Sequence, residues 1–196
     1  MKNLKSCLLL YLTLSIITGM AYPLVVTVLA RTFFPDQAGG SLVRIQGEVR
    51  GSSLIGQKFD SPAYFWPRPS AGDYATIPSS ASNLGPASAG LKQAVAERRQ
   101  RLLPDISDPI PPDLLLASGS GLDPHLSPQA ALAQIDHVAK ARRLNAREKE
   151  NLAALVRQQI QPPQWRVFGS PRVNVLLLNL ALDSLFPSAL PKGAGP

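Results

Sequence analysis

The chain has 196 residues, which suffices for one domain with a modest hydrophobic core. Its 20 basic and 13 acidic residues leave a formal net charge of +7. The basic clusters lack interleaved aromatic residues and no nucleic-acid-binding motif accompanies them, which argues against a nucleic-acid partner. The single cysteine, Cys7, excludes an intrachain disulfide.

The amino-terminal stretch at 7–30, "CLLLYLTLSIITGMAYPLVVTVLA", contains no charged residue. As a helix it rises about 36 Å, enough to cross the ~30 Å hydrocarbon layer. A signal peptide has a shorter apolar core, so the length favours an uncut membrane anchor spanning about 7–30, with Leu8 and Leu29 inside it. The sequences "GMA" and "VLA" could still serve as cleavage sites. We expect Pro23 to bend this helix and Gly19 to admit a partner helix.

Basic residues flank this predicted span unevenly. Lys2 and Lys5 precede it, whereas Arg31 and then Asp36 follow it. Cytoplasmic flanks carry the excess of Lys and Arg, so the sequence predicts a cytoplasmic amino terminus and a soluble part outside the membrane.

Strands are predicted over 32–60. β-branched residues alternate between Val43 and Val49, and Gly47 and Gly51 are expected at turns.

The next stretch, "SPAYFWPRPSAGDY", has prolines that exclude a central strand, yet it holds three consecutive aromatic residues, Tyr64, Phe65 and Trp66. They either pin this loop to the core or, beside Arg68, anchor an interface.

Helices are predicted in the second half of the chain. A basic amphipathic helix is expected over 91–103, with Leu91, Val95 and Leu102 facing inward and Lys92, Arg98 and Arg99 outward.

Ser127 is expected to cap one continuous helix through 129–143. Asn145 and Glu148 form a capping-box pattern at the start of the next helix. The apolar stretch 172–183 is either a buried helix capped at Ser170–Pro171 or a buried strand.

These patterns predict an α+β fold: one amino-terminal transmembrane helix, followed by a single soluble domain with short strands and several helices. The expected divisions are a membrane anchor at 1–31, the soluble domain at 32–183 and a flexible tail at 184–196.

No phosphate-binding glycine loop and no metal-ligand spacing occurs, so we predict neither a bound metal nor a directly bound cofactor. The stretch 117–128, "ASGSGLDPHLSP", holds the residue types of a hydrolytic triad in Ser120, Asp123 and His125. They lie too close together, and the sequence around Ser120 is not the G-x-S-x-G elbow. We favour a preorganised loop with glycines in unusual backbone conformations. A membrane-anchored Ser/His hydrolase of the cell envelope is the alternative.

The stretch 117–128 resembles a signature of the C subunit of the bacterial Kdp potassium-transporting ATPase. So do "GSSLIGQKFDSPAYFWPRPSA" at 51–71, "SNLGP" at 82–86 and "RVNVLLLNLALD" at 172–183. The resemblance runs from about residue 7 to 183. It departs from the family pattern at Pro67 and Ala81.

This resemblance implies a non-catalytic accessory subunit of an ATP-driven potassium uptake complex in the bacterial inner membrane. The implied partners are a channel-like potassium-binding subunit and a P-type ATPase subunit, besides the lipid bilayer; the complex handles ATP and K⁺. Family members are described as needed for assembly and as catalytic chaperones that raise the ATP affinity of the ATPase subunit. Since ATP is cytoplasmic, an outer domain would act on it indirectly. A nucleotide-binding helper in the cytoplasm is the competing hypothesis.

The resemblance also implies that the motif loops, and no catalytic residue, carry the partner contacts. The residues expected in these loops are Gly56, Gln57, Tyr64, Phe65, Arg68, Pro69, Ser70, Ser82, Asn83, Gly85, Pro86, Ser118, Gly119, Gly121, Asp123, Pro124 and His125.

Overall fold

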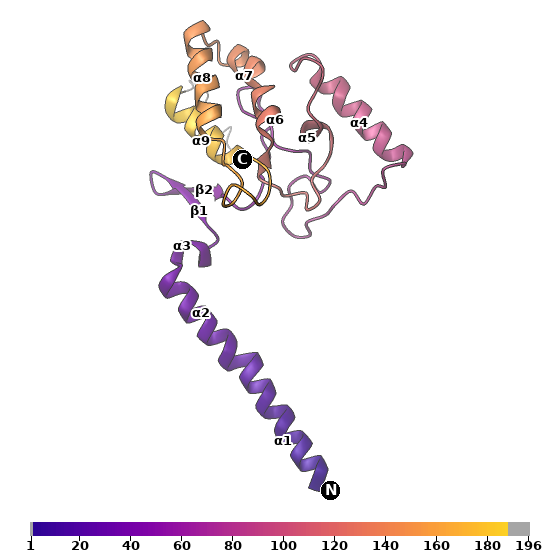
Figure 1. The fold of residues 1–196 in the computed structure, drawn as a ribbon, viewed down its shortest axis with the longest axis vertical. Helices are drawn as coiled ribbons and strands as arrows, with labels where there is room; N and C mark the ends of the chain where they lie inside the picture. Colours follow the sequence, from indigo (N-terminus) through magenta and orange to yellow (C-terminus); the bar gives the residue numbers. More distant parts are fainter. Residues whose placement is uncertain (1, 188–196) are drawn as a thin grey trace. The chain divides into compact units, whose positions relative to one another are not determined.

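The computed structural model describes residues 2–187 (Figure 1). The chain divides after Ser52 into two compact units. The first contains α1 (Lys2–Ile16), the π-helical turn η1 (Ile17–Ala21), α2 (Tyr22–Phe33), α3 (Pro35–Ala38), β1 (Leu42–Ile45) and β2 (Glu48–Ser52). The second contains α4 (Ala89–Leu102), α5 (Pro112–Leu115), β3 (His125–Leu126), α6 (Pro128–Leu132), α7 (Ile135–Ala141), α8 (Ala146–Gln158), β4 (Val173–Asn174) and α9 (Val175–Leu185). The predicted α+β class, with an apolar amino-terminal helix, is confirmed.

The amino-terminal helix is long and apolar enough to cross a membrane over Asn3–Phe33, and none of its most apolar window is buried. Pro23 lacks a backbone N–H, and the chain accommodates it with η1, where the Tyr22 N–H donates to the Ile17 carbonyl. The hydroxyls of Thr18 and Thr27 each donate to the carbonyl four residues earlier, at 2.7 Å. These polar groups are therefore satisfied within the helix, as a lipid environment requires.

β1 and β2 form an antiparallel hairpin, so the predicted strands are confirmed only over 42–52. Residues 35–38 are helical instead, and 53–60 form turns and loop. Gly47 occupies the hairpin turn with φ 83°, as expected. Gly51 does not: it lies inside β2, beside a register shift, with φ 147°. The expected turn at Gly51 was wrong because a β-bulge uses the same glycine freedom.

The core of the second unit lies among α6, α7, α8 and α9. Its fully buried large side chains are Phe65, Ile106, Leu126, Leu152, Leu178, Leu182, Gln134, Val138, Val156, Val173 and Asn179. The two-residue strands β3 and β4 pair antiparallel and join the loop after 117 to the start of α9.

One helix predicted over 129–143 is two helices in the structure. Ser127 caps α6 as expected, by accepting the Ala130 N–H. Residues 133–134 form a turn between the two helices. The buried side chain of Gln134 bonds the Trp66 backbone as well as the Ala130 carbonyl of α6. This tertiary contact overrides the apolar periodicity.

The capping box of α8 is confirmed, with the Glu148 N–H donating to Asn145 at 3.0 Å and the Asn145 N–H donating back at 2.8 Å. The stretch 172–183 is mainly helix α9 after the short β4. Its cap is Asn174, whose side chain accepts the Leu177 N–H, and not the expected Ser170–Pro171.

Helix α4 confirms the helix predicted over 91–103, with Leu102 buried and Leu91 and Val95 half-buried. Arg98 does not face outward as expected: its guanidinium donates to the Leu115 carbonyl at 2.8 Å. The tail expected at 184–196 begins inside α9, and 188–196 lie outside the described residues.

Replacing Leu152 with Ala should lower the free energy of unfolding by about 2–5 kcal/mol, because this side chain is fully buried in α8. Leu155→Ala, on the half-buried side of the same helix, is the matched control and should cost less. Denaturant unfolding of the full chain in detergent, followed by tryptophan fluorescence, measures both. Equal losses would contradict this orientation of α8.

Candidate functional site

The segment 63–68 leaves a turn closed by the Tyr64 N–H and the Ser61 carbonyl, and residues 65–68 then continue without a partner strand. Both backbone groups of Phe65 are bonded by one side chain: its N–H donates to Asn179 Oδ1 at 2.9 Å and its carbonyl accepts from Nδ2 at 3.0 Å. Trp66 is bonded in the same way by Gln134, at 2.7 and 3.1 Å. Side-chain amides thus replace the hydrogen bonds that a neighbouring strand would provide. Phe65 is consequently held fully buried in the core.

Arg142 ties the same segment to the end of α9. Its guanidinium donates to the carbonyls of Ala63 and Phe186 at 2.7 and 2.8 Å and pairs with Asp183 at 2.6 Å. It also lies 5.0 Å from the ring centroid of Tyr64, whose hydroxyl donates to Asp183. Burial, and then the Asp183 charge, raises the pKa of Tyr64. Tyr64 therefore serves this ion pair as a neutral donor.

His137 packs under Trp66, with the rings stacked and their centroids 4.3 Å apart. Its Nε2 lies 3.2 Å from the Tyr64 carbonyl. Burial lowers the pKa of His137, which favours the neutral ring at this place. The aromatic stretch at 64–66 is therefore pinned to the core, and its role as an interface anchor stays a prediction.

The loop at 117–125 docks on the end of this segment. The Ser118 N–H donates to the Pro69 carbonyl at 3.2 Å, and Arg68 pairs with Asp123 at 3.0 Å. Asp123 also accepts the His125 N–H at 3.0 Å and lies 3.4 Å from the His125 ring. Burial opposes ionisation of Asp123, but its hydrogen bonds to His125 and Arg68 outweigh it and lower the pKa. The carboxylate thus stays charged and holds the loop closed.

Glycines are required where these loops touch. The Gly56 N–H donates to the Leu122 carbonyl at 2.7 Å, and a Cβ at Gly56 would lie 2.8 Å from the Asp123 carbonyl oxygen. Gly121 has φ 73°, and a Cβ there would lie 2.6 Å from the Ser80 carbonyl oxygen. Gly119 has neither constraint, which corrects the expectation that it needs a left-handed backbone. Pro124, between these loops, accepts the Val175 N–H.

Comparison with known proteins identifies the family. A family model described as "KdpC: K+-transporting ATPase, c chain" matches residues 4–184. The chain belongs to the KdpC family. It is 47% identical to a potassium-transporting ATPase KdpC subunit of Cereibacter sphaeroides over 94% of this chain and 98% of that one. It is 48% identical to those of Dechloromonas aromatica (93% and 97%) and Rhodospirillum rubrum (96% and 99%). A KdpC chain is an accessory subunit of the potassium-transporting complex, so other Kdp subunits are its expected partners.

In this KdpC chain, the serines of the triad-like loop are engaged locally. Ser120 Oγ accepts the Leu122 N–H at 3.1 Å, and the buried Ser118 accepts the Asp123 N–H at 3.5 Å. Within residues 2–187, no hydrogen bond is found between Ser120 and the His125 ring. The recorded bond of the Ser120 hydroxyl is thus local to its own loop.

The family motif at 82–86 differs from the other motifs because it stays at the surface. Ser82, Asn83, Gly85 and Pro86 are all exposed, and Asn83 has the left-handed backbone expected of a turn, with φ 50°. Of the other expected residues, Ser70 accepts the Tyr74 N–H at 2.9 Å, and the buried Oε1 of Gln57 has no hydrogen-bond partner. The motifs at 51–71, 117–128 and 172–183 thus form an interlocked group of segments bonded to one another, whereas the motif at 82–86 is a surface turn.

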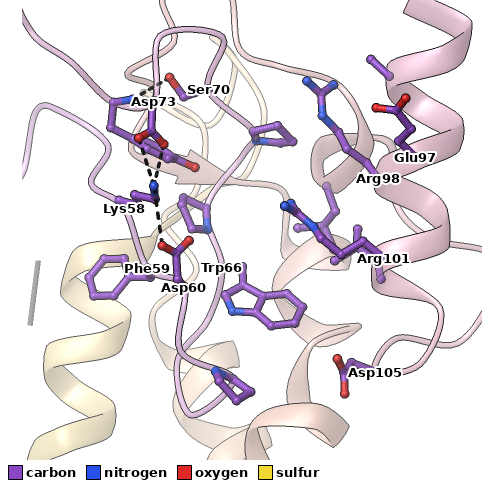
Figure 2. A pocket seen from close by; sticks show the side chains of 17 residues that line it. Lys58, Phe59, Asp60, Trp66, Ser70, Asp73, Glu97, Arg98, Arg101 and Asp105 are labelled. Carbon is purple, nitrogen blue, oxygen red and sulfur yellow. Dashed lines mark hydrogen bonds and ion pairs between the residues drawn. The ribbon is translucent and has the colours of Figure 1, made fainter. Parts of the chain in front are cut away.

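A cavity of about 770 Å³ lies between the loop at 58–74 and α4. Lys58 on one wall is paired with Asp73 at 2.9 Å and Asp60 at 3.7 Å. Figure 2 shows Arg98 and Arg101 extending from α4 toward the loop that carries Trp66. Among the described residues, no group of three or more His, Cys, Asp or Glu is placed to hold a metal ion.

Several residues that build this site were not predicted from the sequence. Asn179 and Gln134 are polar residues inside apolar helical stretches. A polar residue on a buried helix face indicates a buried hydrogen bond, so the sequence did contain a signal for both. Arg142 and Lys58 looked like ordinary surface cations. Their partners are distant in the chain, so no local pattern marks them.

Asn179→Leu should lower the free energy of unfolding by about 2–5 kcal/mol, because the buried N–H and carbonyl of Phe65 would both lose their partners. Asn151→Leu, at an exposed position of α8, should change it by about 0.5 kcal/mol or less. Denaturant unfolding of the full chain in detergent compares them. A mild Asn179→Leu variant would show that the segment does not depend on this amide.

Gly121→Ala should destabilise the protein by about 1–3 kcal/mol, because the added methyl meets the Ser80 carbonyl in a left-handed backbone. Gly119→Ala is the matched control, two residues away with open space around it, and should be tolerated. The same unfolding measurement distinguishes them, and similar losses in both variants would contradict this packing of the loop.

Proposed function

We propose that this subunit is a non-catalytic assembly factor of the potassium-transporting complex. It joins the channel-like and ATPase subunits and raises the ATP affinity of the ATPase subunit. The observation that carries this proposal is that residues of the family motifs bond one another and hold their loops together. Arg68, Asp123 and Ser118 hold loops together, and Ser120 and His125 are not paired for catalysis. Such a body offers partners a preformed surface, and little conformational freedom is lost when they bind.

The apolar helix Asn3–Phe33 is proposed to cross the inner membrane with its amino terminus in the cytoplasm. The uneven flanking charges, Lys2 and Lys5 against Arg31 and Asp36, support this orientation. With the soluble unit outside, the surface turn at 82–86 is available to the channel-like subunit. The effect on ATP then passes through the span and the partner subunits, because outer residues cannot contact cytoplasmic ATP.

Protease treatment of right-side-out vesicles tests this topology. The soluble unit should be digested from outside while the span is protected, because the proposed orientation exposes residues after Arg31. Lysed vesicles are the control for protease access. Digestion only after lysis would place the soluble unit in the cytoplasm and favour a nucleotide-binding helper.

Variants separate an assembly role from a hydrolytic one. Ser120→Ala should co-purify with the partner subunits and retain potassium-stimulated ATPase activity, because Ser120 bonds only a nearby backbone N–H in the described structure. Gly121→Ala should co-purify less, since it disturbs the loop contact with Ser80. Complexes retaining the subunit should show a lower apparent KM for ATP than preparations lacking it. A Ser120→Ala variant that assembles but is inactive would contradict the proposal.

A further inference from the structure

The segment between α8 and α9 forms a small hairpin with an apolar tip. Gln161 and Arg172 exchange backbone hydrogen bonds at 2.8 and 3.0 Å, and Gln164 pairs with Phe168. The tip exposes the apolar residues Trp165, Val167 and Phe168, whose relative exposures are 87%, 74% and 62%. The rings of Trp165 and Phe168 meet edge to face, 6.0 Å apart. The tip is thus an exposed apolar cluster whose two aromatic rings contact each other.

The backbone of this tip is in a conformation that large side chains rarely adopt. Trp165 and Arg166 are consecutive left-handed residues, with φ 50° and 62°. Glycine or asparagine normally fills such positions in tight hairpins. Strain of this kind, held at an exposed aromatic residue, is typical of a contact site rather than of a connecting loop.

The base of the hairpin lies at the end of the unit where the chain enters from the predicted membrane anchor. Asn174, two residues after Arg172, donates from its side-chain amide to the Ser53 carbonyl at 2.8 Å. Ser53 is the first residue of the second unit. Residues 34–52 connect it to the apolar helix, and 19 residues span at most about 65 Å even when fully extended. The base of the hairpin is therefore joined to the apolar helix by at most this length of chain.

The chemistry of the tip fits a lipid headgroup region. Tryptophan is enriched at membrane interfaces, and arginine can place its charge among headgroups while its stem lies against apolar neighbours. Between residues 158 and 182 the only charged residues are Arg166 and Arg172, so this stretch itself brings no carboxylate to an anionic lipid surface. A protein interface usually buries ~800 Å² on each partner, which three side chains do not supply alone. Insertion into a bilayer has no such minimum.

We propose that Trp165, Val167 and Phe168 insert into the lipid interface as a second membrane contact of this subunit. This inference rests on the proposed placement of Asn3–Phe33 across the membrane. The span fixes the subunit in the bilayer, and the tip restricts rotation of the soluble unit above it.

Quenching by brominated phospholipids tests the insertion, because the chain has only two tryptophans. The full-length Trp66→Phe variant leaves Trp165 as the sole reporter, and Trp165→Phe leaves the loop residue Trp66 as the matched control. In vesicles of brominated lipid, Trp165 emission should fall roughly twofold relative to unbrominated vesicles, whereas Trp66 emission should not change. Subtracting the Trp165→Phe signal from that of the wild type gives the same result if Trp66→Phe folds poorly.

Adding Phe168→Ser to the Trp165 reporter should reduce the quenching, since less apolar surface then enters the lipid. Unquenched Trp165 would overturn the insertion, and a blue shift without quenching that requires the other subunits would assign the tip to a protein pocket. Alkaline extraction of the same vesicles checks the span independently. A chain that resists extraction with Trp165 unquenched refutes only the tip, whereas an extractable chain refutes the membrane anchor as well.

Discussion

The second unit depends on two side-chain amides that hydrogen-bond an extended segment from both sides of its backbone. Asn179 of α9 and Gln134, at the start of α7, satisfy the N–H and carbonyl groups of Phe65 and Trp66. Buried backbone groups need partners, and no strand is adjacent to this segment. The same four hydrogen bonds therefore fix both the position of Phe65 and Trp66 and their attachment to α9 and to the start of α7.

Many residues of the family motifs hold this same segment in place. Arg142 and Asp183 fasten one end of the extended segment, and Arg68 and Asp123 connect the other end to the glycine-rich loop. Gly56 and Gly121 allow the backbones to approach where a methyl group would collide. Residues that resemble a catalytic set are thus largely engaged in fixing loop positions. A rigid body of this kind suits a subunit whose proposed task is to hold larger partners in one arrangement.

The exposed features of the chain are distinct from this interlocked group. The apolar helix Asn3–Phe33, the turn at 82–86 and the hairpin tip at Trp165 contribute little to the described core. Exposed apolar surface of this extent is unusual for a soluble protein and marks interaction sites. The residues that build the core are therefore distinct from these exposed features, and partner and lipid contacts are our proposals for the latter.

The sequence by itself determined the features that depend on neighbouring residues. Length and apolarity marked the membrane helix, and Asn145 with Glu148 marked the start of α8, because capping is a local hydrogen-bond pattern. Motif resemblance identified the family. Only the tertiary structure decided the break between α6 and α7, the helical state of 175–185 and the different roles of Gly119 and Gly121. The Trp66 backbone bonds Gln134 at the helix break, and the Ser80 carbonyl restricts Gly121. Both partners lie far away in the chain, and local periodicity carries no information about such contacts.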